Sequence, residues 1–252
     1  MLLGEPQRTP WDLSFSLFGI PVRIHPFFWL VALLLGANSR DAMDILTWVV
    51  ALLVSILFHE LGHALALRAF GAHSWIVLYG LGGITAHNPA QARYSRGSGS
   101  LSQILVSLAG PGAGFLLAGV IAAAVVLSGH RVQVLVGAPF GLLVLVPAGE
   151  TIASPQFTEL IQQLLFINVL WGIVNLLPVY PLDGGQIARE VLVAVNPRAG
   201  IQQSLMLSAL TATALAVVGL ALWKSPFVTL LFGYLAYSSY MALQAYNRRG
   251  PW

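Results

Sequence analysis

The chain has no cysteine among its 252 residues and few charged residues. Without cysteine, neither disulfides nor thiolate ligands are available, so any bound metal must use His, Asp or Glu. Charged residues make up only 8% of the chain, against roughly 25% in soluble domains. No Lys/Arg-rich run occurs and the net charge is only +3, which excludes the electrostatic footprint of nucleic-acid binding. The 57% hydrophobic content and mean hydropathy of +0.80 instead indicate an integral membrane protein.

Six apolar runs are candidate membrane spans, at about 27–37, 45–70, 101–128, 157–178, 202–223 and 226–246. A weaker seventh candidate, 132–147, is broken by glycine and proline. With six spans and a cytoplasmic N-terminus, nine Lys/Arg residues are cytoplasmic and three are outside, whereas a seventh span gives six against six. We therefore predict six spans, cytoplasmic N- and C-termini, and a re-entrant or interfacial segment at 132–147. The first run is short for about 30 Å of hydrocarbon, so it draws on flanking residues or the bilayer thins locally.

The expected fold class is an all-α polytopic membrane protein of about six transmembrane helices, with a short β-hairpin or sheet near the cytoplasmic side. Residues 14–24 show partial alternation that predicts a short strand pair or an interfacial segment. The first fourteen residues mix charges with prolines, unlike a cleaved secretory signal, so we expect this end to be retained. Because the spans take up most of the chain, we expect a single membrane-embedded domain, 1–252.

The sequence His59-Glu60-Leu61-Gly62-His63 lies inside the apolar run 45–70. On a helix, the two histidines project from one face about one turn apart, so both can reach one ion while Glu60 stands beside it. This is the metal-and-base pattern of metalloproteases. The alternative is a set of polar side chains satisfied inside a helix bundle. Polar or charged residues at membrane depth cost on the order of 2.5–3.5 kcal/mol and are normally retained for function, which favours the metal site.

A catalytic zinc site typically has three protein ligands, so a third ligand must come from elsewhere in the chain. The strongest candidate is Asp183, at the end of the fourth expected span. Two prolines before it would break a helix, and Gly184 and Gly185 permit close backbone approach, as expected of an intramembrane site. The alternative is an interfacial loop with a solvated aspartate, because Pro, Asp and Gly are ordinary turn residues.

Three motifs resemble the site-2 proteases, the family of intramembrane zinc metalloproteases. They are Phe58 to His63, the segment Asn175 to Gly185, which is similar to Asn-x-x-Pro-x-x-Pro-Leu-Asp-Gly, and the lead-in Phe18 to His25. The lead-in resembles the small members that include the sporulation pro-sigma-factor processing proteases. These core motifs span 18–185, which leaves accessory C-terminal helices at about 202–246.

The resemblance implies zinc ligation by His59, His63 and Asp183 and catalysis by Glu60. It also implies that Asn168 and Asn175 hold the substrate or stabilise the oxyanion; the alternative for both is interhelical hydrogen bonding. Two departures from the family pattern occur. Gly114 stands where members often carry asparagine. Gly110 and Gly114 then form a small-xxx-small face, which is suited to close packing against the helix that carries His59 and His63. Gln186 stands where many members have arginine.

The resulting hypothesis is an intramembrane endopeptidase with one Zn²⁺ per chain. Its expected substrate is a single-span protein that is cut within its transmembrane segment, as in regulated intramembrane proteolysis. The enzyme itself is expected to be a multi-pass protein of a lipid bilayer, which the resemblance suggests is a prokaryotic cell membrane. Alternatives are a zinc carrier, which needs no base such as Glu60, and an inactive regulatory relative. Its activity could be regulated by a separate membrane partner or by prior cleavage of the substrate. No nucleic-acid partner is expected, and the sequence does not determine the oligomeric state.

The segment 75–85 has β-branched residues and glycines that predict a hairpin. If this hairpin dips into the membrane, its edge could pair with an extended substrate. The alternative is a simple cytoplasmic hairpin. Four further histidines lie outside the motif. We expect His25 to be an interfacial or capping residue and His73 and His130 to be solvated, while His87, after the hairpin, could approach the metal or the substrate.

Overall fold

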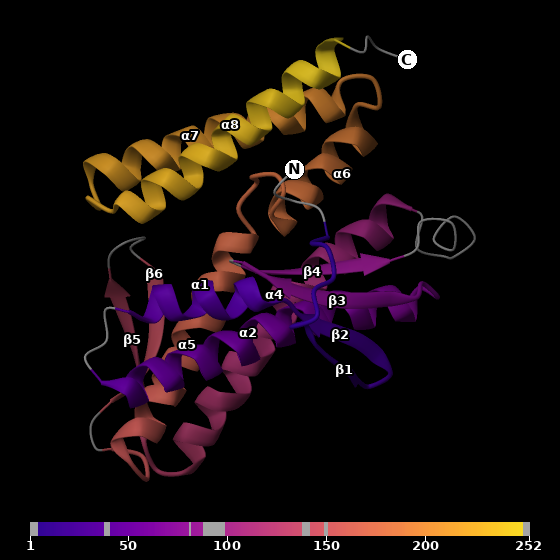
Figure 1. Cartoon of the computed structure of the whole chain (residues 1–252). Helices are drawn as coiled ribbons and strands as arrows, with labels where there is room; N and C mark the ends of the chain where they lie inside the picture. The colour runs from indigo at the N-terminus through magenta and orange to yellow at the C-terminus, as the bar shows by residue number, and fades with distance from the viewer. Residues whose placement is uncertain are drawn as a thin grey trace. The chain divides into compact units, whose positions relative to one another are not determined.

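The computed structural model describes residues 5–37, 41–80, 82–87, 99–137, 142–148 and 151–248. Figure 1 traces the elements along the chain. The strands are β1 (Leu13–Leu17), β2 (Ile20–Ile24), β3 (Ser74–Tyr79), β4 (Gly82–His87), β5 (Arg131–Gly137) and β6 (Leu142–Ala148). The helices are α1 (Pro26–Gly36), α2 (Ala42–Ala69), α4 (Ser100–Leu127), α5 (Pro155–Asn175), α6 (Asp183–Val195), α7 (Gly200–Ala221) and α8 (Pro226–Arg248).

Five helices in the described part of the chain are long and apolar enough to cross a membrane, namely α2, α4, α5, α7 and α8. They confirm the expected class, a multi-pass, mostly helical membrane protein with a small sheet. The first expected span forms α1, an apolar helix of only 11 residues. At 1.5 Å per residue such a helix is about 16 Å long, half of a hydrocarbon core, so the count of six spans is not confirmed.

The two predicted strand pairs are present and join into one sheet. β1 pairs antiparallel with β2, as the partial alternation at 14–24 indicated, and β3 pairs antiparallel with β4, as the β-branched residues and glycines at 75–85 indicated. A parallel pairing of β2 with β3, with Val22 opposite Ile76, makes the order β1-β2-β3-β4. The broken apolar run 132–147 contributes the paired strands β5 and β6 on either side of residues 138–141, which lie outside the described residues.

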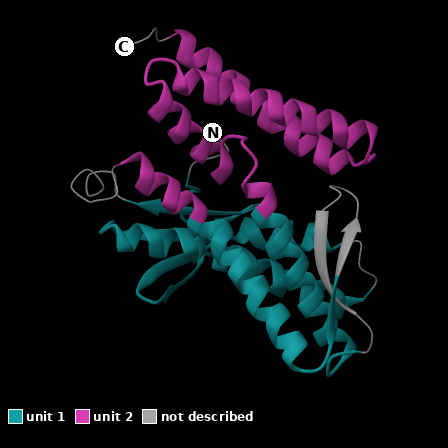
Figure 2. Cartoon of the chain, turned by 180° about the vertical axis from the view of Figure 1, so that it is seen from behind, with its two compact units in different colours: residues 1–98, 109–135, 144–172 teal, residues 99–108, 136–143, 173–252 magenta. Residues whose placement is uncertain are grey.

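The chain forms two compact units, each with its own core (Figure 2). Unit 1 comprises residues 1–98, 109–135 and 144–172. In its core, alternate side chains of β2, together with β3, pack against α1 and α2, including the fully buried Phe28 and Ile56. His25 begins α1 by accepting a hydrogen bond at Nδ1 from the Phe27 amide, 3.1 Å away, which confirms the capping role expected of it.

Unit 2 comprises residues 99–108, 136–143 and 173–252. Its core lies between the antiparallel helices α7 and α8 and the loop that precedes α6. Val179 of that loop is fully buried among Ala212 of α7 and Phe232 of α8. The two C-terminal helices therefore hold the Pro-rich segment that leads to Asp183, a packing role that the sequence pattern did not reveal.

Candidate active site

His59 and His63 lie on one face of α2, in unit 1, as the four-residue spacing predicts. Their Nε2 atoms are 3.2 Å apart, and both side chains are buried. Two nitrogens bound at about 2.0–2.1 Å to one tetrahedral zinc ion lie about 3.3–3.4 Å apart. The histidine pair therefore fits two positions of a single tetrahedral zinc site.

Glu60 lies on the same helix, and strand β4 packs against it. The hydroxyl of Thr85 is 2.7 Å from Oε2 and 3.0 Å from the main-chain oxygen of Glu60, so it can donate to either. Gly83 lies so close to this carboxylate that a Cβ there would be 2.7 Å from Oε1. The hairpin predicted at 75–85 thus forms one wall around the carboxylate.

Gly110, on the glycine face of α4, packs directly behind His63. A Cβ at Gly110 would overlap the imidazole of His63, and a Cβ at Gly62 of α2 would overlap the main chain of Ala109. Close approach of the two helices therefore requires glycine at both positions. This is the packing predicted from the small-xxx-small face.

A hydrogen bond from Asn168 links α5 to α2, the helix that carries His59 and His63. Its Nδ2 lies 2.8 Å from Oγ of Ser55 on α2 and 2.8 Å from the carbonyl of Leu164, and its side chain is almost fully buried. Ser55 stands one helical turn before His59, on the same face. Gly114 of α4 lies beside this amide, and a Cβ there would make an ordinary van der Waals contact with Oδ1, at 3.4 Å. Asn168 thus makes the interhelical hydrogen bond that was the alternative to a substrate-binding role.

Asp183 and Asn175 belong to unit 2. Asn175 is the last residue of α5 and Asp183 the first of α6, and both side chains are buried. Between them the chain turns back so tightly that a Cβ at Gly184 would overlap the carbonyl of Leu176, and one at Gly185 the main chain of Val179. The double glycine therefore serves close backbone packing, as its sequence indicated.

The remaining histidines fall into two groups. His73 is exposed, and His130 is partly exposed with its Nδ1 3.0 Å from the Ser128 hydroxyl, in agreement with the expectation that both are solvated. His87 ends β4 opposite Ser74, and no candidate metal group among the described residues includes it. Sequence reasoning missed Thr85, whose only signal was a small hydroxyl two residues after Gly83 in a mostly apolar hairpin.

The sequence model of peptidase family M50 matches residues 47–219, well over half of the chain. The chain belongs to peptidase family M50. Membership confirms the resemblance to the site-2 proteases. A site-2 protease from Methanocaldococcus jannaschii shares the fold of this M50 protein, with a TM-score of 0.55 and 21% identity over 92% of this chain and 95% of that chain.

Two curated relatives are longer proteins. Zinc metalloprotease MJ0392 of M. jannaschii is 23% identical over 183 residues, which cover 71% of this chain and 44% of that protein. Rip3 of Mycobacterium tuberculosis, named as a candidate zinc metalloprotease, is 28% identical over 174 residues, 66% of this chain and 37% of its own length. The M50 chain therefore spans less than half the length of these relatives.

Proposed function

We propose that this M50 protein is an intramembrane zinc endopeptidase that cleaves a single-span protein within its transmembrane segment, as in regulated intramembrane proteolysis. The observation that carries the proposal is the buried histidine pair on α2, with Nε2 atoms 3.2 Å apart and Glu60 beside it, on a helix apolar enough to cross a membrane. Ionisable side chains in such a helix cost free energy at membrane depth, so they are normally retained only where they have a function.

The proposed metal ligands are His59, His63 and Asp183. Each is a buried side chain that offers a ligand atom of a kind that zinc accepts, and two imidazoles with one carboxylate make a three-ligand set with a position left for water. The names of the relatives MJ0392 and Rip3 support zinc as the metal. When bound, zinc acidifies its water and polarises the scissile carbonyl.

Glu60 is the proposed general base. The Thr85 hydroxyl, 2.7 Å from Oε2, orients the carboxylate and leaves Oε1 to accept a proton from the attacking water. The same oxygen can then pass the proton to the leaving amine. We further propose that the amide of Asn175, buried at the end of α5, donates a hydrogen bond to the oxyanion.

Strand β4 is the proposed docking edge for the substrate. It is the last strand in the order of its sheet, so its outer edge offers main-chain groups to an added strand. A helical substrate hides its carbonyls in intrahelical hydrogen bonds, whereas an extended one exposes them. Thr85 and Gly83 on β4 contact Glu60, which would bring such a strand beside the base.

The proposed location is a prokaryotic cell membrane with both termini in the cytoplasm. The support is the excess of Lys and Arg expected on the cytoplasmic side, nine against three. A separate membrane protein or prior cleavage of the substrate would supply the control. A reporter fusion at each terminus, such as alkaline phosphatase, should be inactive if the termini are cytoplasmic.

The test of the function is cleavage of a panel of single-span substrates by the reconstituted full chain, comparing wild type with Glu60→Gln while measuring bound zinc in both. We expect the wild type to cut and the variant to be inactive yet loaded with zinc. Two zinc-loaded proteins that both cut nothing would overturn the proposal in favour of a carrier or an inactive relative. Zinc flux into liposomes would then distinguish those two.

A further inference from the structure

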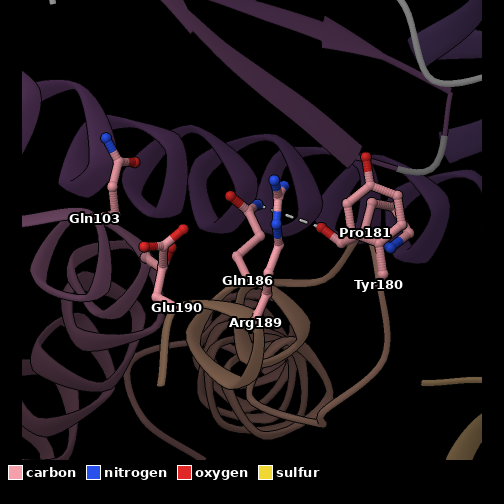
Figure 3. A pocket seen from close by; sticks show the side chains of 7 residues that line it. Gln103, Tyr180, Pro181, Gln186, Arg189 and Glu190 are labelled. Atoms are coloured by element: carbon pink, nitrogen blue, oxygen red, sulfur yellow. Dashed lines mark hydrogen bonds between the residues drawn. The ribbon is translucent and has the colours of Figure 1, made fainter. Parts of the chain in front are cut away.

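A polar cavity of about 230 Å³ lies within unit 2 (Figure 3). Its lining includes side chains from the first turns of α4, from the loop before α6 and from α6 itself: Gln103, Ser107, Tyr180, Gln186, Arg189 and Glu190. Such a volume is below the 300–1,000 Å³ usual for small-molecule sites, and is large enough for a short piece of peptide chain or several waters of about 30 Å³ each.

Helical spacing relates both walls of this cavity to the proposed active-site residues. On α6, Gln186 and Glu190 are three and seven residues beyond Asp183, which places all three on one face. On α4, Gly110 follows Ser107 by three residues and packs against His63 in unit 1. Each helix that lines the cavity thus carries, on the same face, a proposed metal ligand or a residue that packs against one.

The polar groups in the cavity are arranged asymmetrically. In Figure 3, Glu190 lies on the side of Gln103, whereas Arg189 stands beside Gln186, between Glu190 and Tyr180. Gln186 Nε2 lies 3.4 Å from the carbonyl of Pro181. Among the residues that the structure describes, Arg189 has no ion-pair partner. A guanidinium at a polar cavity is suited to a carboxylate, which it binds with two parallel hydrogen bonds.

A second cavity, of about 330 Å³, shares Tyr180 and Arg189 with the first and is also within unit 2. Much of its lining is aliphatic, from α7 and α8, including Ile201, Leu205 and Ala242. Arg189 and Tyr180 therefore mark the boundary between a polar and a largely apolar space. A membrane protein shows the same change of polarity where its span ends and its flanking segment begins.

We propose that the polar cavity binds the segment that flanks the transmembrane span of the substrate, with Arg189 receiving an acidic side chain of that segment. The neighbouring apolar cavity takes the last residues of the span. The subsite rests on the proposed function, and it makes Arg189 a specificity-determining residue for an intramembrane cut near a polar, acidic flank.

The test uses reconstituted full-chain protein and pairs of single-span substrates that differ only in Asp or Lys at successive flanking positions. For Arg189→Glu, we expect KM for the best Asp substrate to rise about tenfold or more, since a charge-assisted hydrogen bond is lost. The variant should favour the matching Lys substrate, with kcat and bound zinc close to wild type. The control is Arg198→Glu, which makes the same change of charge at an exposed residue outside both cavities and should not alter the preference.

A second readout does not depend on cleavage. In the Glu60→Gln background, a photoreactive group on the substrate flank should crosslink to α6, and Arg189→Glu should reduce the yield for the Asp substrate but not for the Lys substrate. Equal effects on both substrates, or effects matched by Arg198→Glu, would overturn the subsite and leave a water-filled cavity. A wild type that cuts no substrate would instead overturn the proposed function and the subsite with it.

Discussion

The main-chain amide of Tyr180 donates a hydrogen bond to the hydroxyl of Ser208 on α7, 3.0 Å away. On the other side, the hydroxyl of Ser239 on α8 lies 3.4 Å from the carbonyl of Tyr180. Both serines are buried, at 1% and 0% exposure. The C-terminal helix pair therefore fixes the loop only three residues before Asp183.

Replacing Ser208 with alanine should weaken zinc binding. A buried amide left without its acceptor costs about 1–3 kcal/mol, so relaxation of the loop should lower zinc affinity about fivefold or more if Asp183 is a ligand. Competition with a chelator measures the affinity. Thr213→Ala is the matched control, because the Thr213 side chain is exposed and its hydroxyl donates to the carbonyl of Ala209 on its own helix. Equal affinities in the two variants would contradict this role.

Gly110→Ala should abolish zinc binding and cleavage together. Its Cβ would overlap the His63 imidazole, so either the ring or helix α4 must move. Gly112→Ala, two positions along the same helix, has nothing within 4 Å of its Cβ and should behave like wild type. Bound zinc, measured by atomic absorption, and cleavage of one substrate test the pair. A Gly110→Ala protein with full zinc and full rate would show that α4 does not pack against His63 in the active enzyme.

Thr85→Val should lower kcat with little change in bound zinc. The variant keeps the shape of the side chain but removes the hydroxyl 2.7 Å from Oε2 of Glu60. A hydrogen bond to a charged group is worth about 1.5–3 kcal/mol, so a loss of roughly 10- to 100-fold is expected. Thr85→Ser keeps the hydroxyl and should restore most of the rate. Equal rates in the valine and serine variants would assign the effect to packing instead.

Asp12 should make the N-terminal sheet sensitive to acid. A hydrogen bond from the Thr9 hydroxyl, and a second from Arg23, lower the pKa of Asp12 from 3.8 to about 2. Because the folded pKa is below the unfolded one, the stabilisation is complete above pH 3.8 and is lost as pH falls to about 2. The protection factors of the β1 and β2 amides, which correct for the intrinsic pH dependence of hydrogen exchange, should therefore fall across this window. Asp12→Asn should remove this part of the pH dependence, and parallel curves for the two proteins would disprove the linkage.

Much of the fold and part of the site followed from local patterns. Hydropathy located the five long helices, because a helix satisfies its main-chain polar groups internally and presents apolar side chains to hydrocarbon. Partial alternation located the pair β1 and β2, and β-branched residues with glycines located the pair β3 and β4. The four-residue spacing of His59 and His63 set their common face, since helical geometry is local. The same patterns did not predict α6, whose 13 residues are amphipathic and too short for a span.

Other features depend on contacts between residues far apart in sequence. The parallel pairing of β2 with β3 joins segments more than fifty residues apart, and no local period encodes such a pairing. The hydroxyl of Thr85 on Glu60 and the bond from Asn168 to Ser55 are likewise made only once a hairpin and a second helix have packed against α2.

By itself, the sequence determined the family and the proposed chemistry of this protein: membrane helices, an HExxH motif and a Pro-Leu-Asp-Gly segment, which together place the chain in family M50 and predict a zinc peptidase. Composition and helical period suffice for that, because they act within one element. Tertiary structure decided which groups support that chemistry, namely Gly110 behind His63, Thr85 on Glu60, and Ser208 holding the loop before Asp183. Those contacts arise from close packing between helices and strands. There the effect of a residue depends on which neighbour it contacts, and its own element does not specify that neighbour.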